Sequence, residues 1–246
     1  MGQRDTTGIP VREGLRLAMN KAWQGLGEPG TWWTGPERIA IAQEARQAMQ
    51  CEFCRQNKAA LSPFHHAGNH DSLGRHSAPL TDAIHRIRTD AGRLTESWLN
   101  ATLAQGLGDT QYVEIVCVVA VVSAVDTYDR AMGHDQRTLP AAGAGEPSRH
   151  RPSGAKPGLG WLATLAPADI RPEDPDPFVR FGQDHIQRAM SLVPQAVIDF
   201  FELDVELYFY ENGIPQRYIQ EKERALSLAQ IEMMAARAAS INGCYY

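Results

Sequence analysis

The chain has 246 residues, 43% of them hydrophobic, which is enough for one large domain or two small ones. Its formal net charge of −5 provides no general attraction to nucleic acid or to an anionic membrane, so we expect neither as a partner. The first residues lack the apolar segment of a signal peptide, and the 4 cysteines do not form a disulfide framework, so we expect a cytoplasmic protein.

The first part of the chain predicts a series of helices. Apolar residues recur at helical spacing, and the segment that begins at Pro36 has Thr34 nearby as a capping residue. Ser62 and Pro63 end the third segment, and an irregular stretch rich in histidine and glycine follows. The predicted helices cover residues 11–27, 36–49, 51–61, 80–90 and 94–108.

The middle of the chain contains a long apolar segment and then a change of composition. Residues 109–133 are rich in β-branched residues, but their length favours a buried helix, capped by Asp109 or Thr110 and ended by Gly133. Of the 15 prolines, 8 lie in residues 139–177, which predicts a long ordered loop. Helical patterns return over 176–192, 194–213 and 215–246. With almost no credible strand, the fold class is predicted to be all-α.

Cys51 and Cys54 form a C-x2-C motif at the start of a predicted helix. The partial positive charge of a helix N-terminus favours the thiolate form, and the spacing brings both sulfurs within disulfide reach. Lys58 lies one turn after Cys54 and adds positive charge that would lower a thiol pKa further. The alternative is that two small side chains pack in a helical core without any chemistry.

A metal site is a weaker alternative for the same motif. Cys51, Cys54, His66 and His70 give the spacing C-x2-C-x11-H-x3-H, which is close to that of a zinc finger. The flanking segments indicate a larger helical domain that does not need a metal to fold. We therefore expect no metal and no cofactor.

Two runs of the sequence, one that leads into the C-x2-C motif and one at residues 230–246, share a further pattern. In "QIEMMAARAASINGCYY", Glu232 precedes Cys244 by twelve residues, and "RIAIAQEARQAMQCEFC" leads into Cys51 and Cys54. These runs resemble the alkylhydroperoxidase D-like (AhpD-like) group of the carboxymuconolactone decarboxylase superfamily. Its hallmark is a glutamate, eleven intervening residues, and C-x-x-C-x-x-x-H opening the next helix. The resemblance implies that Cys54 attacks peroxide and that Cys51 resolves the product.

The sequence departs from this motif where protons should move. Ile39 stands in place of the glutamate and Lys58 in place of the histidine. Glu44 and Glu114 are possible substitutes for the missing carboxylate. We expect Glu44 to be an exposed charge and Glu114 to pair with an arginine.

The resemblance also implies an architecture. It is an AhpD-like helical bundle of two related halves that form one compact domain. Residues 1–135 would be the half that carries C-x2-C, and residues 178–246 the half that ends in the incomplete motif of Glu232 and Cys244. Residues 136–177 would be the proline- and glycine-rich connection.

The leading functional hypothesis is a thiol-dependent oxidoreductase, peroxidase-like or a disulfide reductase. It would act on a small hydroperoxide or disulfide with an unidentified reductant, in a homo-oligomer that the resemblance implies to be a dimer or trimer. The aromatic residues of 200–210 would serve such an interface or the core.

One alternative is a non-redox enzyme of the superfamily, decarboxylase- or isomerase-like, that uses Glu114, Lys58 and His85. The other is a non-catalytic helical scaffold with a Cys/His metal site.

Overall fold

The computed structural model describes residues 9–64, 66–179, 182–208 and 225–244. Within these ranges the regular structure is helical and forms no sheet, and an isolated bridge joins Lys156 and Thr164. The all-α prediction is confirmed. The helices are α1 Glu13–Gly25, α2 Gly35–Ala48, α3 Glu52–Ala59, α4 Ala78–Asp90, α5 Glu96–Ala104, α6 Asp109–Ala131, α7 His185–Ala189, α8 Pro194–Tyr208 and α9 Leu228–Ile241, with 3-10 turns η1 Ala91–Arg93 and η2 Pro167–Asp169.

Local sequence signals explain where α2 and α3 begin. The Thr34 hydroxyl accepts the N–H of Glu37, and the Glu37 carboxylate accepts the N–H of Thr34 at 2.8 Å, which completes a capping box. Cys51 is the N-cap of α3, and its sulfur accepts the N–H of Cys54. The predicted position of the two cysteines at a helix start is therefore confirmed.

The start of α6 differs from the expectation. Gly108 is the N-cap, and its N–H donates to the side chain of Gln111 at 3.0 Å, so neither Asp109 nor Thr110 has the capping role. The end is as predicted, because Gly133 has a φ of +73° just beyond the last helical turn.

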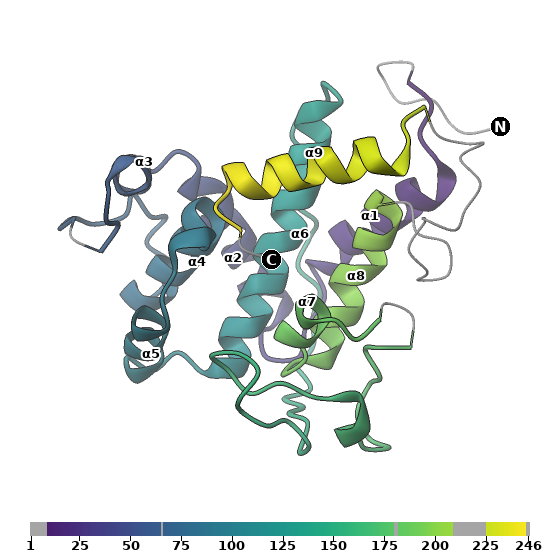
Figure 1. Ribbon diagram of the computed structural model, residues 1–246. Coiled ribbons are helices and arrows are strands. Elements are labelled where there is room, and N and C mark those ends of the chain that lie inside the picture. Colours follow the sequence, from purple (N-terminus) through teal and green to yellow (C-terminus); the bar gives the residue numbers. More distant parts are fainter. Residues whose placement is uncertain (1–8, 65, 180–181, 209–224, 245–246) are drawn as a thin grey trace.

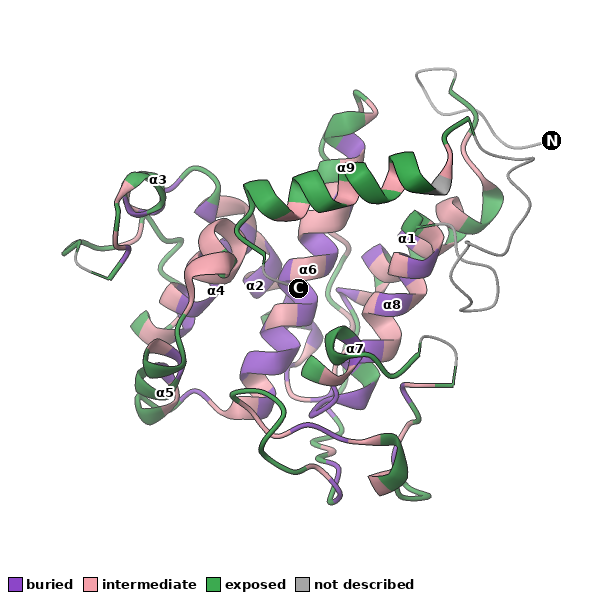
Figure 2. Cartoon of the chain, in the orientation of Figure 1, coloured by how far each residue is buried: buried purple, intermediate pink, exposed green. Residues whose placement is uncertain are grey.

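Helix α6 is the centre of the bundle (Figure 1). Helices α2 and α4 pack on it from one side and α1 and α8 from the other, while α2 contacts α4 and α1 contacts α8. One continuous hydrophobic core runs through these five helices. Among the described helices, α6 alone is long and apolar enough to cross a membrane, but most of it is buried inside the fold (Figure 2), as in the core helix of a soluble protein.

The proline-rich connection is a long loop, as predicted, and it packs against the bundle. Leu165 is fully buried, and its N–H and C=O both bond to the hydroxyl of Ser191. The helix predicted over 176–192 is wrong for most of its length, because α7 is the only helix among the described residues of this range, 176–179 and 182–192. Near the start of this segment, the N–H of Phe178 donates to the Asp176 carboxylate at 2.9 Å, and just before it Asp174 accepts the N–H of Arg171 and a hydrogen bond from His150.

Helix α9 lies on the outside of the bundle and is mostly exposed (Figure 2). Its C-terminal end approaches η1 so closely that a side chain at Gly92 would meet the backbone of Asn242 and Gly243. Part of the predicted segments 194–213 and 215–246 lies outside the described residues. The relation between two helical halves stays a prediction.

Candidate functional site

The two cysteines of the C-x2-C motif lie in the interior of the protein. Cys51 is 2% exposed and Cys54 is 4% exposed, and both are free thiols. The sulfur of Cys51 accepts two backbone N–H groups, from Cys54 at 3.4 Å and from Asp71 at 3.3 Å. These donors stabilise negative charge on the Cys51 sulfur.

Helices α4 and α2 place a histidine and a carboxylate beside Cys54. The Nδ1 atom of His85 lies 3.2 Å from the Cys54 sulfur, and its Nε2 lies 2.8 Å from Oε1 of Glu44. Both His85 and Glu44 are completely buried, so the expectation that Glu44 is exposed is wrong. The N–H of Leu73 also donates to Glu44, which helps to satisfy a charge far from water.

A second histidine reaches the sulfurs from the irregular segment. The Nδ1 atom of His70 lies 3.3 Å from the Cys54 sulfur and 3.7 Å from the Cys51 sulfur. Its Nε2 lies 2.9 Å from the Asp82 carboxylate. Trp98 donates its indole N–H to the same carboxylate at 2.7 Å. The two halves of the cluster therefore follow one pattern, sulfur to imidazole to carboxylate.

The carboxylates determine which imidazole nitrogen faces the sulfurs. In a neutral histidine one ring nitrogen donates and the other accepts. Because Glu44 and Asp82 accept hydrogen bonds at Nε2, the Nδ1 lone pairs of His85 and His70 point toward the cysteines. Such a lone pair can accept a thiol proton or bind a metal ion.

Burial favours the uncharged forms of Cys54 and His85. Burial, together with the neighbouring Cys51, raises the pKa of Cys54 to about 12. Burial lowers the pKa of His85, while Glu44 opposes this effect by stabilising the imidazolium. Burial alone would raise the pKa of Asp82, but hydrogen bonds from His70 and Trp98 and the charge of Arg86 hold it below its usual value. Cys54 therefore needs a base or a metal ion to become a thiolate.

A cavity of about 910 Å³ opens beside the cysteines and connects them to the surface. It lies between α3, the end of α4 with η1, α6 and the C-terminal end of α9. Lys58, Arg88 and Arg130 line it together with Cys51 and Cys54. A small molecule in this cavity would lie beside both cysteines, along a partly cationic wall.

The other predicted catalytic residues do not join this cluster. Lys58 is exposed on α3 and shares only the cavity. Glu114 is buried on α6, where its Oε1 lies 3.6 Å from Nη1 of Arg38 and its Oε2 accepts the N–H of Trp32 at 2.6 Å. The predicted arginine pairing is thus confirmed. Burial raises the pKa of Glu114, although Arg38 opposes this. The trio Glu114, Lys58 and His85 is not brought together, so the structure gives no support to the non-redox alternative.

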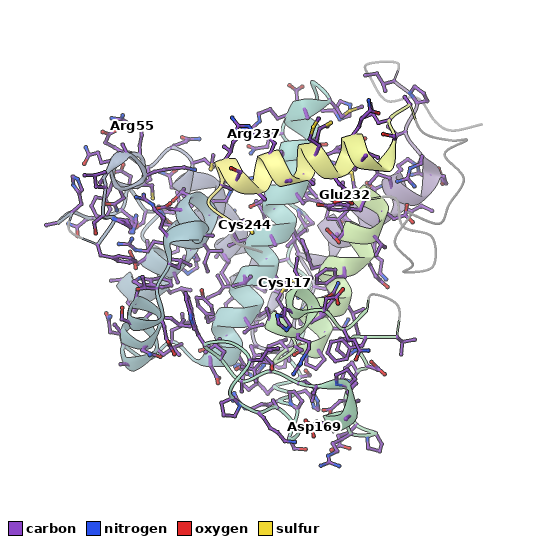
Figure 3. The ribbon with its side chains drawn as sticks, in the orientation of Figure 1. Arg55, Cys117, Asp169, Glu232, Arg237 and Cys244 are labelled. Carbon is purple, nitrogen blue, oxygen red and sulfur yellow. The ribbon has the colours of Figure 1, made fainter. Side chains whose placement is uncertain are left out.

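The incomplete C-terminal motif also lies apart. Glu232 is exposed on α9, and Cys244 is exposed beyond the end of that helix (Figure 3). His66 is exposed as well, so it is not the fourth member of a Cys/His group. Among the described residues, a group that could hold a metal ion contains His85 in its place, and its members are Cys51, Cys54, His70 and His85.

The sequence contained one signal for the roles of His85 and Glu44. His85 occurs in the inward pattern of α4, next to the buried Ile84 and Ala83, where a polar residue needs a buried partner. Glu44 occupies the matching inward position on α2, between the buried Ala42 and Ala45. When each of two adjacent helices has one ionisable residue flanked by core residues, the two side chains are expected to form a buried pair.

Comparisons of the chain with protein-family models, with curated proteins and with solved structures found no match.

Proposed function

We propose that the protein is a thiol-dependent oxidoreductase, peroxidase-like or a disulfide reductase, that works through Cys54 and Cys51. One observation carries this proposal: the Cys54 sulfur, His85 and the buried Glu44 form a chain with successive contacts of 3.2 Å and 2.8 Å. His85 and Glu44 thus supply a proton relay. The sequence motif lacks its usual relay, because Ile39 and Lys58 replace the glutamate and the histidine. A nucleophile, a base and a group that orients the base are the parts of an activated thiol.

In the first step, His85 accepts the thiol proton of Cys54, and Glu44 stabilises the imidazolium. The Cys54 thiolate attacks one peroxide oxygen, the O–O bond breaks, and the alkoxide leaves. The proton on His85 passes to the alkoxide, which gives an alcohol. Cys54 is then a sulfenic acid, and His85 is neutral again.

In the second step, Cys51 attacks the sulfur of the Cys54 sulfenic acid. An S–S bond forms, and the hydroxyl group leaves as water with the thiol proton of Cys51. The backbone N–H groups of Cys54 and Asp71 support negative charge on the attacking sulfur. An external dithiol then reduces the disulfide by exchange, which closes the cycle.

The surroundings of the site suggest further properties. The cationic side chains of Lys58, Arg88 and Arg130 favour a substrate that carries an acidic group, such as a carboxylate. A reducing compartment such as the cytoplasm would keep both thiols available between turnovers. The dimer or trimer that the family resemblance implies is part of the proposal.

Peroxide consumption by the metal-free, reduced protein tests the proposal. Cys54→Ser should abolish it, whereas Cys51→Ser should leave one turnover and a trappable sulfenic acid at Cys54. The control Cys244→Ser removes an exposed thiol outside the cluster and should have no effect. The proposal fails if Cys54→Ser keeps both peroxide consumption and disulfide reductase activity.

A further inference from the structure

The two sulfurs and the two Nδ1 atoms surround a common point. These four donor atoms, from Cys51, Cys54, His70 and His85, all lie within 4.8 Å of one another. In a tetrahedral zinc site, bonds of about 2.3 Å to sulfur and 2.0 Å to nitrogen put S and N about 3.5 Å apart. Three of the four S···N distances are 3.2, 3.3 and 3.7 Å, and the fourth is within 4.8 Å, so small shifts are enough to complete such a tetrahedron.

The groups behind the donor atoms also suit a metal ion. Histidine ligands commonly donate their other ring N–H to a carboxylate, which fixes the tautomer and strengthens the ligand. Here Glu44 has this place behind His85 and Asp82 has it behind His70, at 2.8 Å and 2.9 Å. The sulfur of Cys51 accepts two backbone N–H groups, as a metal-bound thiolate does.

We propose that Cys51, Cys54, His70 and His85 hold one zinc ion, and that the bound ion keeps the dithiol inactive until an oxidant releases it. Two thiolates and two imidazoles in tetrahedral arrangement select zinc among common divalent ions. Four protein ligands leave no open coordination position, so the ion regulates and does not catalyse. The regulatory part rests on the proposed function, whereas zinc binding does not.

Release of the zinc ion is a two-electron oxidation of the cysteine pair by the proposed hydroperoxide substrate. The two zinc-bound thiolates give up two electrons as they form the Cys51–Cys54 disulfide, and the zinc ion departs. A hydroperoxide takes these two electrons and two protons from solvent, its O–O bond breaks, and it becomes an alcohol and water. His70 and His85 stay unchanged. After reduction of the disulfide, the site can bind zinc again.

Cobalt(II) titration of the full-length, reduced, metal-free protein tests the binding. We expect one equivalent per chain, the strong visible bands of tetrahedral cobalt, a sulfur-to-cobalt charge-transfer band, and displacement by zinc. His70→Ala and His85→Ala should each remove this spectrum, and Asp82→Asn should weaken binding by roughly 10–100-fold. The matched control is His66→Ala, which removes an exposed histidine and should bind cobalt like the wild type.

A measurement on the wild-type protein keeps the test valid if a variant does not fold. Zinc should protect Cys51 and Cys54 from alkylation, as mapped by mass spectrometry, while the exposed Cys244 reacts with or without zinc. Peroxide should then abolish the protection and release the ion. Absence of tetrahedral cobalt bands, equal loss of them in His66→Ala, or no protection of Cys51 and Cys54 would overturn the zinc site.

The two proposals fail separately. If metal-free protein consumes peroxide but binds neither cobalt nor zinc, the proposed function stands and the zinc site is wrong. If the protein binds zinc through the four residues but its metal-free form consumes no peroxide and reduces no disulfide, the zinc site stands and its regulatory part falls with the proposed function. If zinc binds and leaves peroxide consumption unchanged, the regulatory part alone is wrong.

Discussion

The Nε2 atom of His85 lies 2.8 Å from Oε1 of Glu44, and neither side chain is exposed to solvent. A carboxylate without solvent needs a partner of this kind, since an unpaired buried charge is strongly unfavourable. The pairing fixes the imidazole so that its other nitrogen faces Cys54. The reactivity and metal affinity of the cysteine pair therefore depend on a carboxylate from a different helix.

Glu44→Gln should slow the chemistry of Cys54 in the metal-free protein. The amide keeps the size of the side chain but removes the charge that raises the pKa of His85, so His85 becomes a weaker base. We expect alkylation of Cys54 at neutral pH and peroxide consumption to fall by about 100-fold. Glu52→Gln changes an exposed carboxylate on α3 and is the control. Equal rates in both variants would contradict the relay.

Arg93→Met should loosen the helix that carries the cysteines. Arg93 donates hydrogen bonds to the backbone oxygens of Asn57 and Ala60 at the end of α3, both at 2.7 Å. Their loss should cost about 1–3 kcal/mol of stability and speed hydrogen exchange in α3. The control Arg55→Met removes an exposed charge on α3 and should change stability by less than about 0.5 kcal/mol. Unchanged exchange in α3 would show that Arg93 does not hold the helix.

Gly30→Ala should destabilise the fold through the buried pair of Arg38 and Glu114. A Cβ atom at Gly30 would overlap Oε1 of Glu114 and crowd Nη1 of Arg38. Moving a buried ion pair apart leaves charges without compensation, so we expect a loss of about 3 kcal/mol in the free energy of unfolding. Gly25→Ala adds the same atom where nothing beyond its chain neighbours and the backbone of its own helix lies within 4 Å, and it is the matched control. Denaturant titration of both variants measures their free energies of unfolding, and equal values would contradict the prediction.

Asp204→Asn should stabilise the protein near neutral pH. Burial raises the pKa of Asp204 to about 6, whereas the same carboxyl in the unfolded chain titrates near about 4. The folded state therefore holds a proton that the unfolded state has lost, so stability falls as pH rises through this window. We expect a gain of about 1–2 kcal/mol for Asp204→Asn at pH ~7.5 that shrinks toward pH ~4.

The exposed Asp135→Asn is the control for this pH dependence. Thermal unfolding of the wild type and both variants across the pH range gives the comparison. A gain for Asp204→Asn that does not change with pH would contradict titration of Asp204 as its cause.

Local patterns were sufficient to predict most of the helices. The helical periodicity and the capping residue Thr34 predicted α2, and the length of the apolar run predicted α6 as a buried helix. Cys51 and Cys54 at a helix start followed from the same local reasoning. The helix predicted over 176–192 was mostly wrong, and near its end the Ser191 hydroxyl bonds to the backbone of Leu165, a tertiary contact that no local pattern contains.

The sequence by itself determined the helical class and the place of the dithiol, because both depend on residues within one or two helical turns of each other. Only the tertiary structure decided which distant residues complete the site. His70 and His85, each with its carboxylate, come from a loop and from α4, and Glu44 comes from α2. Their proximity depends on how α2 and α4 pack against α6, and a spacing rule such as the one that favoured His66 contains no information about that packing.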